Sequence, residues 1–114
     1  MSEAEKRAGR WLTDMGIPWV DQWDEIPPWR LDFYLPSAHI GLEVDGPYRH
    51  HTPKRHGQRD EDLWDRARLL ILRIRVKELR RETFEHAVRS FIAENEESFQ
   101  ERTEWWRDRK RQLA

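Results

Sequence analysis

The sequence has no cysteine among its 114 residues, which excludes a disulfide scaffold and any thiolate nucleophile or thiolate metal ligand. It also has no secretory signal and no apolar run of about 18 residues, the length that a membrane-spanning helix needs. Internal repeats and low-complexity linkers are absent too. We therefore expect a single cytoplasmic domain without a membrane span, able to bury roughly two-thirds of its unfolded surface.

What the sequence does contain is charge, distributed unevenly along the chain. Charged residues make up 38% of it and hydrophobic residues 37%, but seven tryptophans and four phenylalanines can still build a core. Residues 1–48 hold four basic and nine acidic side chains. Residues 49–89 hold twelve basic and seven acidic side chains, and residues 90–114 hold five basic and six acidic ones. An acidic block followed by a basic one suits an enzyme that acts on a phosphodiester, although an ordinary charged surface helix gives the same pattern.

Residues 30–46 have the pattern of a β-hairpin. Apolar and polar side chains alternate in both halves, and residues 36–39 are typical of a turn. The apolar positions are Leu31, Phe33, Leu35, Ile40, Leu42 and Val44. We expect Leu35 to pair with Ile40 across the four-residue turn.

This register places three carboxylates on one face of the hairpin. Asp32 lies opposite Glu43, with the side-chain stems about 5 Å apart, and Asp45 follows two residues further along. Carboxylates this close resist ionising together, and a hard divalent cation such as Mg²⁺ would relieve that repulsion. The hairpin is therefore a candidate metal site, and the alternative is an ordinary solvated polar face.

The rest of the chain predicts helices around a small sheet. The predicted helices are residues 2–15, residues 58–66, and one that is capped by Glu82 or Thr83 and continues through residues 93–114; a further strand spans residues 19–23. Residues 69–75 form the most apolar run, which predicts an interior strand that is parallel to a neighbour because a helix precedes it. The order of elements indicates an α/β fold, a small mixed sheet flanked by helices.

Two further places could contribute chemistry. The loop 47–57 is rich in histidine and basic residues, and His50 lies close enough after Asp45 to serve as a general base or acid. A solvated loop histidine is the simpler interpretation of His50. Glu5 stands three residues after Ser2, which fits a capping box, so Glu5 could merely satisfy backbone donors at the start of a helix.

Several short motifs occur together within residues 2–92. They are Ser-x-x-Glu at residues 2–5, Gln22, Leu-Asp-Phe-Tyr-Leu-Pro at 31–36, Leu-Glu-Val-Asp-Gly at 42–46, a following histidine, and Ile-Leu-Arg at 71–73. As a set, these motifs resemble the DUF559 and very-short-patch-repair-endonuclease branch of the PD-(D/E)xK nuclease superfamily, which includes phage homing endonucleases. The resemblance implies a restriction-endonuclease-like fold for residues 1–92, with residues 93–114 as a charged helical extension.

The resemblance also assigns roles to individual residues. It implies that Asp32 binds the metal, that Glu43 and Asp45 occupy the E-x-(D/E/K) positions, and that Glu5 is a helix glutamate near the site. It makes His50 a catalytic histidine. Tyr48 corresponds to the aromatic position that wedges into duplex DNA in the mismatch-repair enzyme, although a rim or core tyrosine is the alternative.

The function implied by the resemblance is metal-assisted hydrolysis of DNA phosphodiester bonds. Asp32, Glu43 and Asp45 would hold Mg²⁺, with Mn²⁺ as a substitute, and Asp45 or His50 would orient or deprotonate a water. The candidate contacts to the DNA backbone are Arg49, Lys54, Arg55, Arg73 and Arg75, in addition to the wedge residue Tyr48. A monomer would nick one strand, and a double-strand cut would need a second subunit or two events. The C-terminal helix, with Phe99 and Trp106 seven residues apart, is a candidate contact of a homodimer, and the alternative is a helix folded back on its own domain.

The chain departs from the pattern of the family at two positions. Asp45 stands where the superfamily usually has a lysine, so another base has to orient the water or none does. Arg68 stands near a point where family members commonly have glycine. These departures leave two alternatives to a DNA endonuclease: a nucleic-acid-binding or accessory module that keeps the fold without catalysis, and an RNase that uses the same groups.

Overall fold

The computed structural model describes residues 1–45, 53–75, 77 and 79–114, and it describes only the backbone of residues 53–56. In chain order its elements are α1 (Glu3–Asp14), β1 (Val20–Trp23), β2 (Leu31–Leu35), β3 (Ile40–Asp45), α2 (Pro53–Ala67), β4 (Leu70–Arg75), α3 (Arg81–Glu94) and α4 (Phe99–Leu113). Within these described ranges, no helix is both long enough and apolar enough to cross a membrane.

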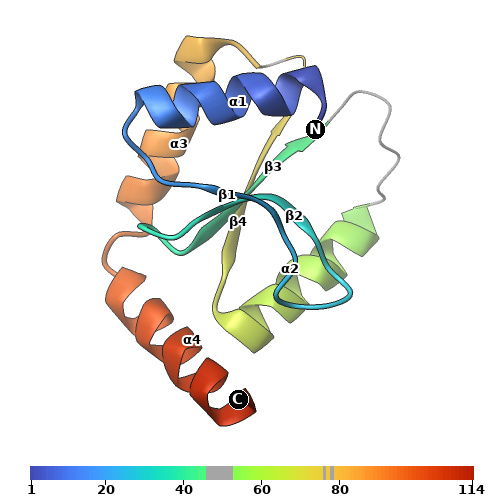
Figure 1. Cartoon of the computed structure of the whole chain (residues 1–114), viewed down its shortest axis with the longest axis vertical. Helices are drawn as coiled ribbons and strands as arrows, with labels where there is room; N and C mark the ends of the chain where they lie inside the picture. The colour runs from blue at the N-terminus through green and yellow to red at the C-terminus, as the bar shows by residue number, and fades with distance from the viewer. Residues whose placement is uncertain (46–52, 76, 78) are drawn as a thin grey trace.

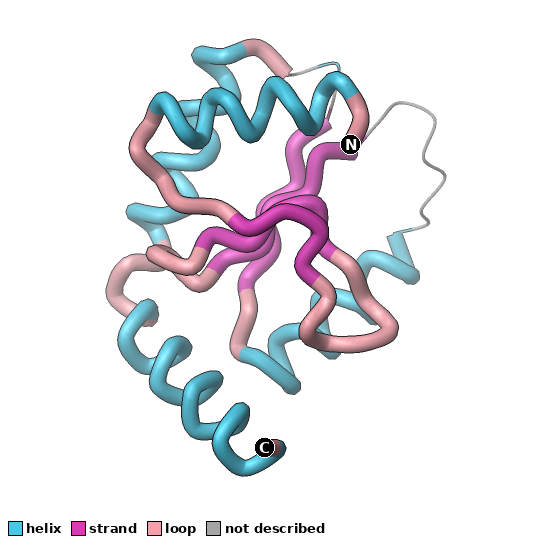
Figure 2. Tube along the Cα trace, in the orientation of Figure 1, coloured by secondary structure: helices cyan, strands magenta, loops and turns pink. Residues whose placement is uncertain are grey.

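The strands form one mixed sheet in the order β1-β2-β3-β4. Figure 2 shows them in magenta at the centre of the molecule, with helices on either side. β1 and β2 are antiparallel, as are β2 and β3, whereas β4 pairs with β3 in parallel after the α2 crossover. The predicted small mixed sheet flanked by helices is therefore confirmed. The prediction of an interior strand at residues 69–75 is wrong, because β4 lies at the edge of the sheet. Its apolar run arises because both of its faces are covered, with Ile74 in one core cluster and Ile71 against the other.

Helices cover both faces of the sheet (Figure 1). On one face α1 and α3 pack on Phe33, Leu42 and Val44, and on the other α2 and α4 pack around Leu31. The second face approaches the backbone so closely that a Cβ at Gly41 would stand 2.6 Å from Leu31 Cδ1. A glycine in the middle of β3 is thus required by packing.

Two helices begin at places that the sequence pattern does not predict. α2 starts at Pro53 instead of residue 58, and proline suits the first turn because its missing N–H has no intrahelical partner there. α3 follows Arg80, which makes no side-chain capping bond, so the predicted cap at Glu82 or Thr83 is wrong.

The continuous helix predicted through residues 93–114 is also wrong. α3 ends at Asn95, whose Nδ2 donates to the carbonyl of Phe91 at 2.8 Å, and Ser98 Oγ donates to the carbonyl of Asn95 at 3.1 Å. Short polar side chains that bond to nearby backbone compete with the helical hydrogen bonds. A separate helix, α4, therefore starts after Ser98.

Arg102 connects α4 to the rest of the domain by hydrogen bonds. Its side chain is 2% exposed and donates to the carbonyls of His39 at 2.6 Å, Ala38 at 3.2 Å and Asn95 at 3.2 Å. Trp106 is buried in the same layer. α4 thus folds back on its own chain and uses Trp106 there, which leaves the predicted dimer contact without support. The division at residue 92 stays a prediction.

His39 connects the hairpin turn to the end of α2. Its Nε2–H donates to the carbonyl of Ala67 at 2.8 Å, since a carbonyl can only accept, so Nδ1 accepts from the Tyr34 hydroxyl at 2.7 Å. His39 is fully buried, and this burial lowers its pKa to about 4, against the opposing effect of its bond to Ala67. Burial likewise raises the pKa of Tyr34 to about 12.

We expect His39 to make the fold sensitive to acid. Its pKa falls from 6.5 when unfolded to about 4 when folded, so the unfolded chain binds the proton first. The stabilisation is complete above pH 6.5 and decreases by about 3 kcal/mol as the pH falls to about 4. Urea unfolding of wild type and His39→Asn across this range measures it, since Asn tolerates the positive φ of 51° at this position.

The control for this experiment is His86→Gln, which changes an exposed histidine. It should keep the full acid dependence, whereas the free energy of unfolding of His39→Asn should change less with pH. Equal pH dependence in all three proteins would contradict the assignment to His39.

Candidate active site

The site begins where the hairpin strands stop pairing. The predicted register is confirmed, with Leu35 opposite Ile40, and regular pairing ends at Phe33 and Leu42. The next residues on the two strands are Asp32 and Glu43.

Beyond this point, hydrogen bonds from backbone N–H groups to the two carboxylates join the strands. Asp32 Oδ2 accepts from the backbone N–H of Val44 at 2.8 Å, and Glu43 Oε2 accepts from the backbone N–H of Asp32 at 3.3 Å. Only 6% of Asp32 and 3% of Glu43 is exposed. The structure therefore brings these two carboxylates together, as the sequence predicts, in a buried position rather than on a solvated face.

The two acids are electrostatically costly to bury together. Burial raises the pKa of Glu43, and the neighbouring charge of Asp32 and the hydrogen bond between the two side chains raise it further. Arg59 from α2 opposes this rise, because its Nη1 lies 2.5 Å from Glu43 Oε1. A largely covered guanidinium, 12% exposed, is thus the cation that balances the acid pair in this structure.

Arg59 belongs to an ion-pair network that joins α2 to β4. Its Nε lies 3.8 Å from Asp60 Oδ1, and Asp60 accepts two bonds from Arg73, at 2.6 Å and 2.5 Å. The bonds to Asp60 raise the pKa of Arg73, and the charges of Asp45 and Glu43 add to this effect. Arg73 is therefore held by Asp60, and its predicted contact with DNA phosphate stays a prediction.

Both guanidinium groups keep an unused donor. The Nε atoms of Arg59 and Arg73 are buried and have no hydrogen-bond partner in the part of the chain that the structure describes. Buried donors are rarely left unsatisfied in proteins without a functional reason or a bound water or ion. The surroundings of the acid pair can therefore accept a further oxygen ligand, as an anion or a water.

Glu5 reaches the same region from α1. The predicted cap is present, because Ser2 Oγ accepts from the backbone N–H of Glu5 at 3.1 Å. The carboxylate itself is 4% exposed and accepts from Gln22 Nε2 at 3.4 Å. Gln22 stands in register beside Asp32, between the neighbouring pairs of β1 and β2. The helix start is thus bonded to β1 at the position that neighbours the hairpin acid.

The remaining predicted residues are less defined. Asp45 ends β3, is half-buried and is in register with Arg75 of β4. Residues 46–52 and the side chains of 53–56 lie outside the described residues, and they include Tyr48, Arg49, His50, Lys54 and Arg55. Among the residues that are described, no group of three or more His, Cys, Asp or Glu side chains is arranged to hold a metal ion. Ligation by Asp45 therefore stays a prediction.

The pair of Asp32 and Glu43 nevertheless suits a divalent cation. Mg²⁺ in proteins often takes only one or two carboxylates and completes its shell with water and substrate phosphates. Burial and then the nearby charge of Asp32 raise the pKa of Glu43, and a bound cation would favour the charged form of both acids. The residues present are thus compatible with a metal site of two protein ligands.

Arg59 is the residue of this site that the sequence reasoning missed. It lies within a stretch of alternating charge, where each arginine has the same pattern as a surface residue. No local signal singles it out, because its position beside Glu43 depends on how α2 packs against β3.

Comparison with known proteins supports the fold. The solved structure titled "Homing Endonuclease I-Bth0305I Catalytic Domain" matches with a TM-score of 0.57 and 19% sequence identity, over 87% of this chain and 94% of that one. No protein-family model and no curated protein matches the chain. The architecture of this chain is therefore similar to that of a homing endonuclease catalytic domain.

Proposed function

We propose that the chain is a metal-dependent DNA endonuclease that hydrolyses phosphodiester bonds, in the DUF559 and very-short-patch-repair branch of the PD-(D/E)xK superfamily. The observation that carries this proposal is the buried pair of Asp32 and Glu43 on neighbouring strands, beside the guanidinium of Arg59. Two like charges in a buried site destabilise the fold, and such groups cluster at functional sites. The similarity to a homing endonuclease catalytic domain supports the same conclusion.

In this proposal Asp32 and Glu43 hold Mg²⁺, or Mn²⁺ in its place, and Asp45 is a further ligand. The bound ion would lower the pKa of a water and offset the negative charge that develops on the phosphate. Arg59 balances Glu43 until the ion is present and then donates to a phosphate oxygen. Its Nε, which has no hydrogen-bond partner among the described residues, supports this second role.

The other residues bind, orient or exchange protons. Asp45 or His50 orients the attacking water or takes its proton, and Glu5 keeps the helix start beside the site through Gln22. Tyr48 wedges into the duplex. The proposed contacts to the phosphate backbone are Arg49, Lys54, Arg55, Arg73 and Arg75.

We also propose a domain division, a location and a mode of cutting for the protein. Residues 1–92 form the nuclease unit and residues 93–114 an extension, in a cytoplasmic protein. A single centre nicks one strand of DNA, so a double-strand cut requires a homodimer or two events.

A catalytically inactive binding module is the second candidate function. Two observations favour it: Arg59 already neutralises Glu43, and Asp45 replaces the usual lysine. Such a module would bind DNA equally well with and without Mg²⁺ and cut none.

A plasmid-nicking assay tests the proposal. Supercoiled DNA should convert to open circles with Mg²⁺ or Mn²⁺ and stay supercoiled with EDTA, because the acid pair needs the cation to act on phosphate. Conversion is measured on gels, with a mock purification from the same host as the control. Binding without nicking in Mg²⁺ would favour the inactive module, and preferential cutting of RNA in competition would favour an RNase.

A further inference from the structure

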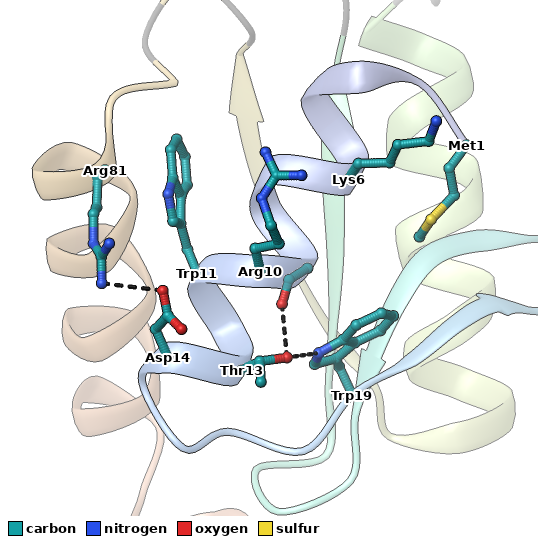
Figure 3. A pocket seen from close by; sticks show the side chains of 9 residues that line it. Met1, Lys6, Arg10, Trp11, Thr13, Asp14, Trp19 and Arg81 are labelled. Atoms are coloured by element: carbon teal, nitrogen blue, oxygen red, sulfur yellow. Dashed lines mark hydrogen bonds and ion pairs between the residues drawn. The ribbon is translucent and has the colours of Figure 1, made fainter.

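A cavity lies along the outer side of α1. It has a volume of about 520 Å³, which is within the size range of ligand sites. Lys6, Arg10, Trp11, Asp14, Trp19 and Arg81 line it, from α1, the start of α3 and the segment before β1. Figure 3 shows Arg10 between the two tryptophan rings.

Cations outnumber acids in this pocket. Lys6 pairs with exposed Glu3 at 3.3 Å, and Arg81 pairs with Asp14 at 3.3 Å and with Glu85 at 3.1 Å. Arg10 is exposed, and no residue that the structure describes forms a hydrogen bond or an ion pair with it. Arg10 is therefore the pocket cation that is open to an anionic ligand.

One wall of the pocket is a fixed aromatic ring. Trp19 Nε1 donates to Thr13 Oγ1 at 3.0 Å, and the ring packs edge-on against Phe33 with centroids 5.3 Å apart. Gly9 leaves no spare room behind it, since a Cβ there would stand 3.1 Å from the ring. Trp19 is half-exposed, so part of a ring that is already ordered remains available for stacking.

The pocket adjoins the candidate active site through α1. Glu5 points inward to Gln22, whereas Lys6 and Arg10, one helical turn apart, lie on the outer side. The two cations therefore belong to the same helix as Glu5, on its exposed side. A cation beside an aromatic face is the combination that binds a phosphate together with its base.

We propose that this pocket binds a nucleotide of a single strand that flanks the cleavage site, with its phosphate at Arg10 and Lys6 and its base against Trp19. This inference rests on the proposed nuclease function, because that function supplies the strand. It adds a substrate subsite formed by residues outside the acid pair and outside the basic block.

The test is strand binding in EDTA, where cutting does not interfere. A fluorescein-labelled single strand of about twelve nucleotides is titrated with protein, and anisotropy gives the affinity at several salt concentrations. Lys6→Gln/Arg10→Gln should bind at least about fivefold more weakly, and the slope of log affinity against log salt should decrease by about 0.7 for each lost contact. The single variant Arg10→Lys, which keeps the positive charge, should bind the strand almost as tightly as wild type.

Two further variants separate charge from stacking and from general effects. Trp19→Leu should weaken binding without changing the salt slope, and thermal unfolding shows whether the variant is folded. Arg89→Gln, which removes an exposed arginine of α3 outside the pocket, should bind like wild type. If the Lys6/Arg10 double variant also binds like Arg89→Gln, the inference is overturned.

The outcomes distinguish this inference from the nuclease proposal. If the double variant loses affinity but wild type never nicks DNA, the binding pocket is supported and the nuclease proposal is contradicted. If wild type nicks DNA but the double variant binds with unchanged affinity, the nuclease proposal is supported and the binding pocket is contradicted. If deoxyadenosine monophosphate displaces the labelled strand as well as an unlabelled strand does, the occupant is a free nucleotide and the strand assignment is wrong.

Discussion

Asp32→Asn should abolish Mg²⁺-dependent nicking, with a rate at least about 100-fold below that of wild type. The amide keeps an oxygen that can accept the Val44 N–H, as Asp32 Oδ2 does at 2.8 Å, but it removes the charge that would hold the cation. Removing that charge also removes one cause of the raised pKa of Glu43. The melting temperature of Asp32→Asn should therefore equal or exceed that of wild type.

The matched control for this experiment is Asp62→Asn. Asp62 is a carboxylate of α2 that accepts from Trp29 Nε1 at 2.6 Å and from Arg66, away from the acid pair. It should nick like wild type, with a somewhat lower melting temperature because its bonds to Trp29 and Arg66 weaken. Full nicking by Asp32→Asn would indicate a contaminating nuclease or a misplaced site. A large fall in its melting temperature would identify Asp32 as a structural residue.

Arg102→Ala should reduce the free energy of unfolding by about 4 kcal/mol and the melting temperature by more than about 10 °C. The guanidinium donates to three carbonyls, and two of these, of Ala38 and His39, belong to the hairpin turn. Without it, buried carbonyl groups lose their donor, and α4 loses its link to the rest of the domain. Urea unfolding followed by circular dichroism measures the change.

Arg107→Ala provides the control, since Arg107 is exposed on the same helix. Its stability should stay within about 0.5 kcal/mol of that of wild type. Arg102→Met adds a second comparison, because it keeps most of the volume and loses only the donors. If Arg102→Met is as stable as wild type, the carbonyl contacts contribute nothing and packing alone holds α4.

The hairpin could be predicted from the sequence because its information is local. Alternation of apolar residues fixes which side chains share a face, and a short turn fixes the register, so the opposition of Asp32 and Glu43 follows from a few neighbouring residues. The edge position of β4 could not be predicted in this way. Strand order depends on which helices cover each face, and that is decided by contacts between distant segments.

Arg59 and Arg68 show two other limits of the sequence. Arg59 becomes part of the site only because α2 crosses beside β3, a placement that no motif encodes. Arg68 has a φ of 54°, a backbone conformation that glycine adopts at lower cost. Its side chain compensates by lying over the rings of Trp64, at 5.1 Å, and Trp105, at 4.4 Å. That compensation depends on α4, which the motifs do not cover.

The open sheet has consequences for solubility, because β1 and β4 each have one side without a neighbouring strand from the described parts of the chain. Gln22 has a φ of 50°, which distorts β1 in its middle, and β4 ends in charged Arg73 and Arg75. A bent edge and a charged edge are poor templates for the addition of another strand. The protein is therefore protected against edge-to-edge aggregation on both sides of its sheet, even though the sheet is not closed.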